Sequence, residues 1–324
     1  MYEKFYGLTE RPFDLTPNPK YLFLTPSHRE ALSSLEYGIT ARTGVTVLIG
    51  EAGTGKTTLI RATLETQRWK TKTSYMNNPT LTRSEFLEFL AKEFQLPPGA
   101  AESKTKLLTE LERRLLDLWQ SGTTPALIID EAQSLPYELL EEIRLLANIE
   151  TTTEKLLPIV LAGQPELADI LNHTSLRQLK QRVGLRCRLK QLDQVETGAY
   201  ITARVAVAGG HAATLFTREA VIAIHERSQG IPRTISVICH NALINGFALS
   251  RRPITDELVR EVCEDFDIES PVSTPVRQID TLDSAQRRKP PEPTPGSVVR
   301  HSASRELFKG LARPRRRYSF FNGS

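Results

Sequence analysis

The chain has 324 residues, of which 40% are hydrophobic and 25% are charged, and its formal net charge is +4. These values are typical of a soluble globular protein with one or two domains. No apolar run approaches the ~18 residues that a membrane-spanning helix needs. Acidic, basic and proline residues interrupt the start of the chain, so a signal peptide is not expected either.

The net positive charge comes from the last part of the chain. Residues 271–324 contain 11 Lys or Arg, 4 Asp or Glu and seven of the 20 prolines, whereas the first 270 residues are slightly acidic. Because this segment is poor in hydrophobic residues, we expect a disordered, proline-rich basic tail over residues 269–324. Three interpretations of the tail stay open: contact with DNA, contact with an anionic membrane surface, or a solubilising end.

The cysteines and histidines argue against a disulfide framework and a zinc site. Cys187, Cys239 and Cys263 are widely spaced and form no C-x-x-C motif, and the six histidines show no metal-ligand spacing. We therefore expect three buried thiols and a cytoplasmic protein.

The predicted elements alternate between helix and strand over residues 26–192. Residues 1–25, rich in proline and aromatic residues, are expected to form an extended arm, and Thr25-Pro26 is typical of a helix start. Strands are predicted at 45–49, 71–78, 125–130 and 156–163. Helices are predicted at 26–43, 56–67, 82–94, 104–120 and 136–150. This alternation predicts an α/β domain with a parallel sheet and helices on both faces.

From residue 193 the pattern changes to helices alone. Four helical stretches are predicted, at 195–208, 217–228, 233–249 and 255–266, with no strand between them. We therefore expect a small all-α lid domain over residues 193–268.

The run from Gly50 to Thr57 matches the Walker A pattern and lies between an apolar strand and a helix. Its glycines allow successive N–H groups to face one phosphate at a helix N-terminus. Lys56 supplies a charge for the β and γ phosphates, and the hydroxyl of Thr57 is a ligand for Mg²⁺. The predicted nucleotide-binding residues are Gly50, Glu51, Ala52, Gly53, Thr54, Gly55, Lys56, Thr57 and Thr58.

The apolar strand ending in Asp130-Glu131 has the form of a Walker B motif. Asp130 would hold Mg²⁺, and Glu131 would orient the attacking water. A nucleoside triphosphate is therefore expected to be hydrolysed. ATP is favoured over GTP, because no N-K-x-D segment is present.

Four further polar residues follow predicted elements that could reach a nucleotide. Gln164 follows the fourth strand, Arg177 and Arg182 precede a short strand, and Arg233 starts a helix of the lid. An arginine at a helix end could stabilise transition-state charge in a neighbouring subunit. The alternatives are an ordinary loop glutamine and solvated surface arginines.

Taken in order, these motifs resemble the AAA+ ATPases, and more closely the ExeA/GspA type linked to bacterial secretion and envelope assembly. The resemblance covers about residues 1–268 and rests on "FYGLTERPFDLTPNPKYLFLTPSHREAL", "IDEAQSLPYELLEEIRLLANIET" and "LAGQPELADIL" followed by "LRQLKQRV". It implies that Gln164 is sensor 1, Arg182 the arginine finger with Arg177 second, and Arg233 sensor 2. It also implies that the arm, including Phe13, and the helix start at Pro26 flank the adenine.

The resemblance implies an oligomer that uses ATP and Mg²⁺ to assemble or remodel a protein partner of a secretion or export apparatus, in the cytoplasm or at the inner membrane. Longer members continue into a membrane segment and a peptidoglycan-binding domain, where this sequence has the basic tail. Two alternatives stay open. One is a DNA-associated regulator, because transposition ATPases of the TniB/MuB/TnsC kind share the architecture. The other is a nucleotide-gated scaffold with little turnover.

Overall fold

The computed structural model describes residues 1–14, 16, 18–67, 71–77 and 79–268. The tail predicted for residues 269–324 lies outside these described residues. Within them, no helix has the length and apolarity to cross a membrane. The three cysteines are free and buried, as expected.

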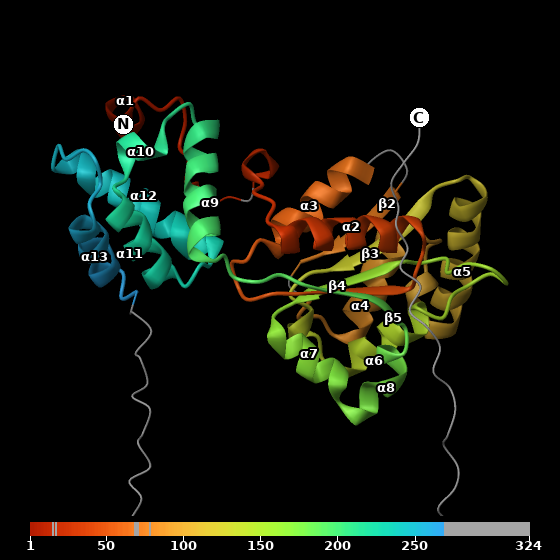
Figure 1. The fold of residues 1–324 in the computed structure, drawn as a ribbon. Helices are drawn as coiled ribbons and strands as arrows, with labels where there is room; N and C mark the ends of the chain where they lie inside the picture. The colour runs from red at the N-terminus through yellow and green to blue at the C-terminus, as the bar shows by residue number, and fades with distance from the viewer. Residues whose placement is uncertain (15, 17, 68–70, 78, 269–324) are drawn as a thin grey trace, which may run out of the picture. The chain divides into compact units, whose positions relative to one another are not determined.

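A five-stranded parallel sheet forms the centre of the first domain (Figure 1). Its strands are β1 (Val45–Ile49), β2 (Thr71–Met76), β3 (Thr124–Ile129), β4 (Ile159–Gly163) and β5 (Val183–Arg188). They lie in the order β2-β3-β4-β1-β5. All pairings are parallel, so the carboxyl ends of the strands share one edge of the sheet. In parallel α/β sheets ligands bind at this edge.

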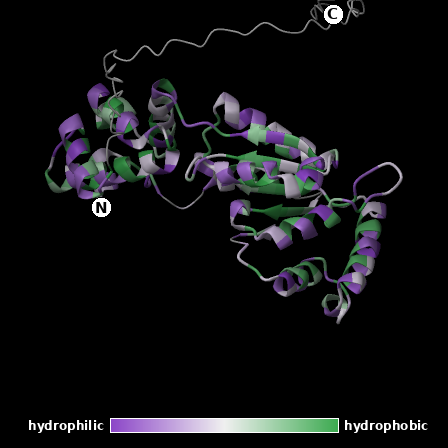
Figure 2. Cartoon of the chain, turned by 90° about the horizontal axis from the view of Figure 1, so that it is seen from below, coloured by the Kyte–Doolittle hydropathy of each residue, from purple (hydrophilic) through white to green (hydrophobic). Residues whose placement is uncertain are grey.

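Helices cover both faces of the sheet. One face packs against α2 (Pro26–Thr40) and α3 (Lys56–Gln67). The other face is covered by α4 (Arg83–Glu93), α5 (Lys104–Gln120), α6 (Tyr137–Leu146), α7 (Pro165–Asn172) and α8 (Arg177–Lys180). Because both faces are covered, the central strands β1, β3 and β4 are buried and largely apolar, and strands of the sheet are green in Figure 2. The edge strands β2 and β5 also carry polar and charged residues. The predicted doubly covered α/β fold is confirmed.

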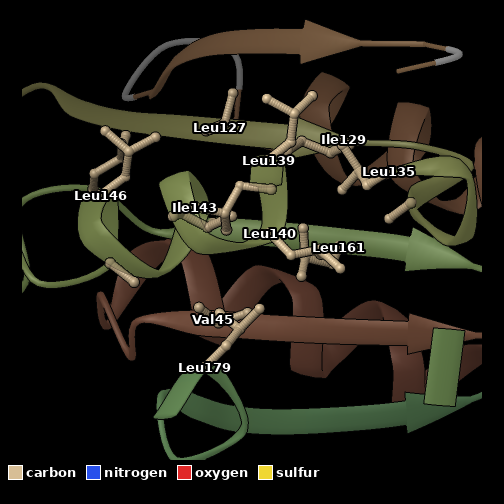
Figure 3. Packing of buried hydrophobic residues seen from close by; sticks show 14 of the residues in the cluster. Val45, Leu127, Ile129, Leu135, Leu139, Leu140, Ile143, Leu146, Leu161 and Leu179 are labelled. Carbon is tan, nitrogen blue, oxygen red and sulfur yellow. The ribbon is translucent and has the colours of Figure 1, made fainter. Parts of the chain in front are cut away.

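Alternate residues of the central strands β1, β3 and β4 supply the two cores. Val45, Leu127, Ile129 and Leu161 point toward α6 and α8 (Figure 3). Leu48, Ile128 and Val160, at the intervening positions of the same strands, belong to the cluster with α2 and α3. This alternation follows from the two-residue period of a strand. It fixes the register, and with it the position of the loops that follow each strand.

Side-chain caps define several helix starts. The Thr25 hydroxyl accepts a hydrogen bond from His28 N, and Pro26 is the first helical residue of α2. Thr82 with Glu85, and Asp193 with Glu196, form capping boxes. The helices therefore begin within about two residues of their predicted positions, and the main differences lie at their C-terminal ends.

The helical domain contains α9 (Gln194–Val207), α10 (Ala212–Leu215), α11 (Arg218–Ser228), α12 (Pro232–Ala248) and α13 (Asp256–Asp265). Ile201, Ile235 and Val259 belong to its own buried cluster. The four predicted helices are present, and α10 is a short addition that the sequence did not indicate.

The expectation of an extended, irregular arm is wrong for the first residues. Tyr2–Tyr6 form a helix, α1, which ends at Gly7 with φ 71°. Tyr2, Tyr6, Leu8 and Phe13 are buried in the cluster of the helical domain, and α1 lies with its helices in Figure 1. Burial of these aromatic side chains explains the helix, since five residues alone would not be helical in water.

Candidate nucleotide-binding site

The loop between β1 and α3 forms a cradle at the carboxyl edge of the sheet. Gly53 and Gly55 have φ angles of 79° and 98°, which glycine adopts without strain. A Cβ at Gly53 would lie 2.7 Å from Cβ of Arg233. The backbone therefore passes too close to its neighbour for any side chain, as the predicted phosphate loop requires.

Lys56 lies at the mouth of this loop. Its Nζ donates to the carbonyls of Gly50, at 2.8 Å, and Glu51, at 3.1 Å. The residue is 5% exposed, and burial lowers its pKa, which the nearby Glu131 and Asp130 partly counteract. An ammonium with so little water around it interacts strongly with an anion placed at the loop.

Thr57 and Asp130 meet across the two motifs. The hydroxyl of Thr57 donates to Asp130 Oδ2 at 2.6 Å. Tyr75, on β2, donates to the same oxygen at 2.9 Å, and Glu131 N donates to Oδ1 at 3.0 Å. A buried carboxylate beside a hydroxyl is a set of hard oxygen donors, which fits Mg²⁺.

Glu131 is held by two amides. Gln133 Nε2 donates to Glu131 Oε2 at 2.6 Å, and Gln164 Nε2 lies 3.4 Å from the same oxygen. Gln133 Oε1 accepts from Gln164 N at 3.0 Å, which joins the ends of β3 and β4. Glu131 itself has φ 53° and ψ 37°, a left-handed conformation that costs a non-glycine residue about 1 kcal/mol or more. The structure thus brings Gln164 beside Glu131, and its role as sensor 1 stays a prediction.

A cavity of about 330 Å³ opens beside the loop. It is lined by Asp14, Thr16, Asn18, Tyr21, Leu22, Phe23, His28, Gly53, Thr54, Gly55, Lys56, Thr57, Thr58, Glu131, Leu192, Tyr200, Arg204, Pro232, Arg233 and Ser236. Its walls therefore come from the arm, the α/β domain and the helical domain.

Two contacts join the cavity's walls. Arg233 N donates to the carbonyl of Gly53 at 3.2 Å, so the predicted sensor 2 residue lies beside the loop. His28 Nε2 lies 3.1 Å from the carbonyl of Thr54, and its Nδ1 lies 2.7 Å from Thr25 Oγ1. Because a carbonyl only accepts, Nε2 carries the proton and Nδ1 accepts from Thr25. Burial lowers the pKa of His28 and keeps the ring neutral.

Arg177 and Arg182 do not line the cavity. Both are exposed; Arg177 starts α8, and Arg182 directly precedes β5. Val183 pairs with Val45, the first residue of β1, whereas the phosphate loop follows the last residue of β1. The length of that strand, about 13 Å, therefore separates Arg182 from the loop of its own chain.

The arm lines the cavity, but Phe13 does not. Phe13 is fully buried and packs edge to face on Phe216 in the helical domain. Pro26 follows the Thr25 cap, next to the cavity residue His28. Sequence reasoning did not anticipate Tyr75, Gln133, His28 or Arg204. Of these four, only Gln133 could have been predicted to lie near the site, because it follows the Walker B residues Asp130-Glu131 by two positions.

Comparison with known proteins agrees with this geometry. The AAA domain family matches residues 39–171. Over 249 residues the chain is 44% identical to General secretion pathway protein A of Aeromonas hydrophila. Residues 39–171 thus form an AAA domain. The expected similarity to the GspA type is confirmed by the relative. The match covers 76% of this chain and 45% of that relative, so the chain spans about half of the relative's length.

Two solved structures share the fold of this chain. It matches the ORC2 protein of Aeropyrum pernix with a TM-score of 0.60 and 18% identity, over 79% of this chain and 71% of that one. It matches Cdc6p of Pyrobaculum aerophilum with a TM-score of 0.59 and 18% identity, over 76% and 68% of the two chains. At this level of identity the likeness concerns the fold.

Proposed function

We propose that the protein is an ATPase that binds ATP with Mg²⁺ and hydrolyses it to ADP and phosphate. The observation that carries this proposal is the convergence of Lys56, Thr57, Asp130 and Glu131 on one cavity or its immediate edge. A site that only stored a nucleotide would need the first three, but not a carboxylate oriented by two amides.

Each residue has a distinct part in this reaction. The loop amides and Lys56 would hold the phosphate chain, and Thr57 and Asp130 would hold Mg²⁺, which would neutralise phosphate charge. Glu131 accepts a hydrogen bond from the attacking water and orients it. Gln164 and Gln133 fix the carboxylate of Glu131 by donating to its Oε2, and Arg233 approaches the phosphates from the helical domain.

We further propose that the working form is an ATP-dependent homo-oligomer. Arg182 is exposed and lies near the amino end of β5, away from its own phosphate loop. A guanidinium there could complete only a neighbour's site, which is the geometry of an arginine finger supplied in trans. Arg177 is the second candidate, since it too is exposed.

The protein partner is proposed from the relative. Because the relative is named for the general secretion pathway, we propose a cytoplasmic ATPase that assembles or remodels a component of a secretion or export apparatus, in peripheral contact with the inner membrane. The match covers 45% of the relative, so this role is carried over from a match to part of that protein.

A DNA-associated role is the second candidate. The observation that favours it is the excess of 11 basic over 4 acidic residues in positions 271–324, which suits a sequence-independent, salt-sensitive contact with phosphates. An ORC1 protein of Aeropyrum pernix, solved in complex with DNA, also shares the fold with a TM-score of 0.58.

A mixing experiment tests the ATPase and its oligomer together. The Arg182→Ala variant keeps Glu131 in its own nucleotide site but cannot supply the arginine finger to a neighbour. The Glu131→Gln variant supplies the arginine finger but lacks the carboxylate in its own site. We expect each variant alone to be nearly inactive, and the mixture to regain part of the ATP turnover. Turnover that is unchanged in Arg182→Ala would contradict the finger, whereas no ATP binding by the wild type would contradict the ATPase. Stimulation by double-stranded DNA in low salt would favour the DNA-associated role.

A further inference from the structure

The arm forms a strap between the two halves of the cavity wall. We define the strap as residues 14, 16 and 18–25. Before it, residues 2–13 belong to the helical domain, where Thr9 N donates to the carbonyl of Ala208 at 2.9 Å. After it, α2 packs on the sheet. Asn18, Tyr21 and Phe23 of the strap line the cavity.

Arg204, on α9, holds the start of this strap. Its Nε donates to the carbonyl of Pro12 at 2.6 Å, and one terminal nitrogen lies 3.3 Å from the carbonyl of Asp14. The other terminal nitrogen donates to the hydroxyl of Tyr200 at 2.8 Å. The guanidinium thus donates hydrogen bonds to two backbone carbonyls of the arm and to one side chain of its own helix.

The same guanidinium is enclosed by aromatic rings. Its Cζ lies 4.7 Å from the ring centre of Tyr21 and 5.4 Å from that of Tyr200. Arg204 is 9% exposed and yet lines the cavity. A planar cation is needed here, because it stacks on rings while donating within its plane.

We propose that Arg204 is a positioning residue for the bound nucleotide: it fixes the strap so that the strap forms the wall around the base and ribose. This inference rests on the proposed nucleotide site. The phosphate loop, the strap and α9 all line the cavity. With the phosphates held at the loop, the strap and α9 are the walls left for the base and ribose. Arg204 acts on that end through backbone carbonyls and leaves Lys56, Thr57 and Glu131 untouched.

The first test separates binding from chemistry. Arg204→Met removes the donors but keeps apolar bulk, and Arg204→Lys keeps the charge without the planar fork. We expect KM for MgATP to rise about tenfold or more in Arg204→Met, since hydrogen bonds of a charged group are lost. We expect a smaller rise in Arg204→Lys, and kcat within about twofold of wild type in both. Arg218→Met, an exposed arginine of α11, is the matched control and should match wild type.

The second test measures amide hydrogen exchange in the strap, using the full chain without nucleotide. The amide of Tyr21 is bonded to the carbonyl of Asn18 within the strap, whereas that of Thr9 is bonded to Ala208 in the helical domain. In Arg204→Lys we expect faster exchange at Tyr21 and unchanged exchange at Thr9. Equal loss of protection at both amides would show that Arg204 serves folding of the helical domain and would overturn the proposal.

The two tests distinguish this inference from the proposed function. If the wild type binds no ATP or ADP, the ATPase is wrong, and so is the role of Arg204 in binding. If ATP turnover is present but Arg204→Met leaves KM unchanged, or lowers kcat alone, the ATPase stands and the positioning role is wrong.

Discussion

Thr57 Oγ1 and Asp130 Oδ2 lie 2.6 Å apart, which ties the first turn of α3 to the end of β3. Each oxygen thereby limits where the other can move, so the two proposed magnesium ligands are set before the ion arrives. Tyr75 donates to the same carboxylate oxygen and adds a third constraint.

Replacing Thr57 tests this arrangement. Thr57→Ala removes a hydrogen bond to a charged group, which contributes about 1.5–3 kcal/mol, and a metal ligand. We expect the Mg²⁺ concentration for half-maximal ATP turnover to rise at least about tenfold. Thr57→Ser retains the hydroxyl and should stay near wild type. An equal effect of both substitutions would instead point to packing of the methyl group.

Replacing Glu131 separates binding from hydrolysis. In Glu131→Gln the amide cannot accept the water's proton, so we expect turnover to fall about 10²–10⁴-fold, while the affinity for ATP stays within a few-fold. Single-turnover hydrolysis and equilibrium binding are the two measurements. Loss of ATP affinity to the same degree as turnover would contradict the role of Glu131 as a water-orienting base.

Replacing Gln133 tests the orientation of the Glu131 carboxylate without removing that carboxylate. Gln133→Leu removes the 2.6 Å hydrogen bond to Glu131 Oε2 and the acceptor for Gln164 N. We expect a reduced kcat with little change in KM, because only the carboxylate is misplaced. Gln133→Glu should be worse than Gln133→Leu, since a second carboxylate would repel Glu131.

Gly53 tests the contact between the loop and the helical domain. A Cβ at this position would meet Cβ of Arg233 at 2.7 Å, and φ is 79°. Gly53→Ala should therefore separate Arg233 from the loop and weaken nucleotide binding. Gly198→Ala is the matched control in α9, because the nearest atom to its added Cβ is 3.7 Å away. There we expect a gain of about 0.5–1 kcal/mol in stability, since alanine suits a helix better than glycine.

His28 gives a dependence of stability on pH. Burial lowers its pKa in the folded state, so the unfolded chain binds the proton first when the pH falls below about 6.5. The free energy of unfolding contributed by this residue is therefore complete above that pH and decreases below it. His28→Gln keeps a donor for the Thr54 carbonyl but does not titrate.

Urea unfolding at about pH 7.5 and about pH 5.5 measures this effect. We expect the wild type to lose more stability than His28→Gln between the two values. His240 also has a pKa lowered by burial, but it is present in both proteins and cancels in the difference. Equal losses would contradict the assignment of a neutral His28.

The sequence predicted the α/β domain well for a physical reason. Buried parallel strands are almost entirely apolar, as in Val45–Ile49 and Ile159–Gly163, and the glycine loop directly follows the first of them. Local signals sufficed there. The roles of Arg177 and Arg182 as arginine finger and of Arg233 as sensor 2 stay predictions. Arg233 lies beside the phosphate loop, and the other two arginines lie away from it.

Residues that act across long sequence distances escaped sequence reasoning. Tyr75 reads as an ordinary strand residue until parallel pairing of β2 and β3 places it beside Asp130. Phe13 was expected beside the adenine, but its ring is buried against Phe216, about 200 positions away. Nothing near residue 13 in the chain indicates that partner. The contact of Arg204 with Pro12 is hidden in the same way.

The burial of Tyr2 and Tyr6 among α9 to α13 makes the helical domain discontinuous in sequence. The α/β domain is, in effect, an insertion within it, joined by two chain connections instead of one. During synthesis, residues 2–13 are made well before the residues they pack against, which lie about 190 positions later in the chain. The inserted α/β domain contains all its own strands, so it can fold first. We therefore expect residues 26–192 to be the fragment that folds when it is expressed alone. A fragment starting at residue 193 would expose the apolar surface that α1 covers.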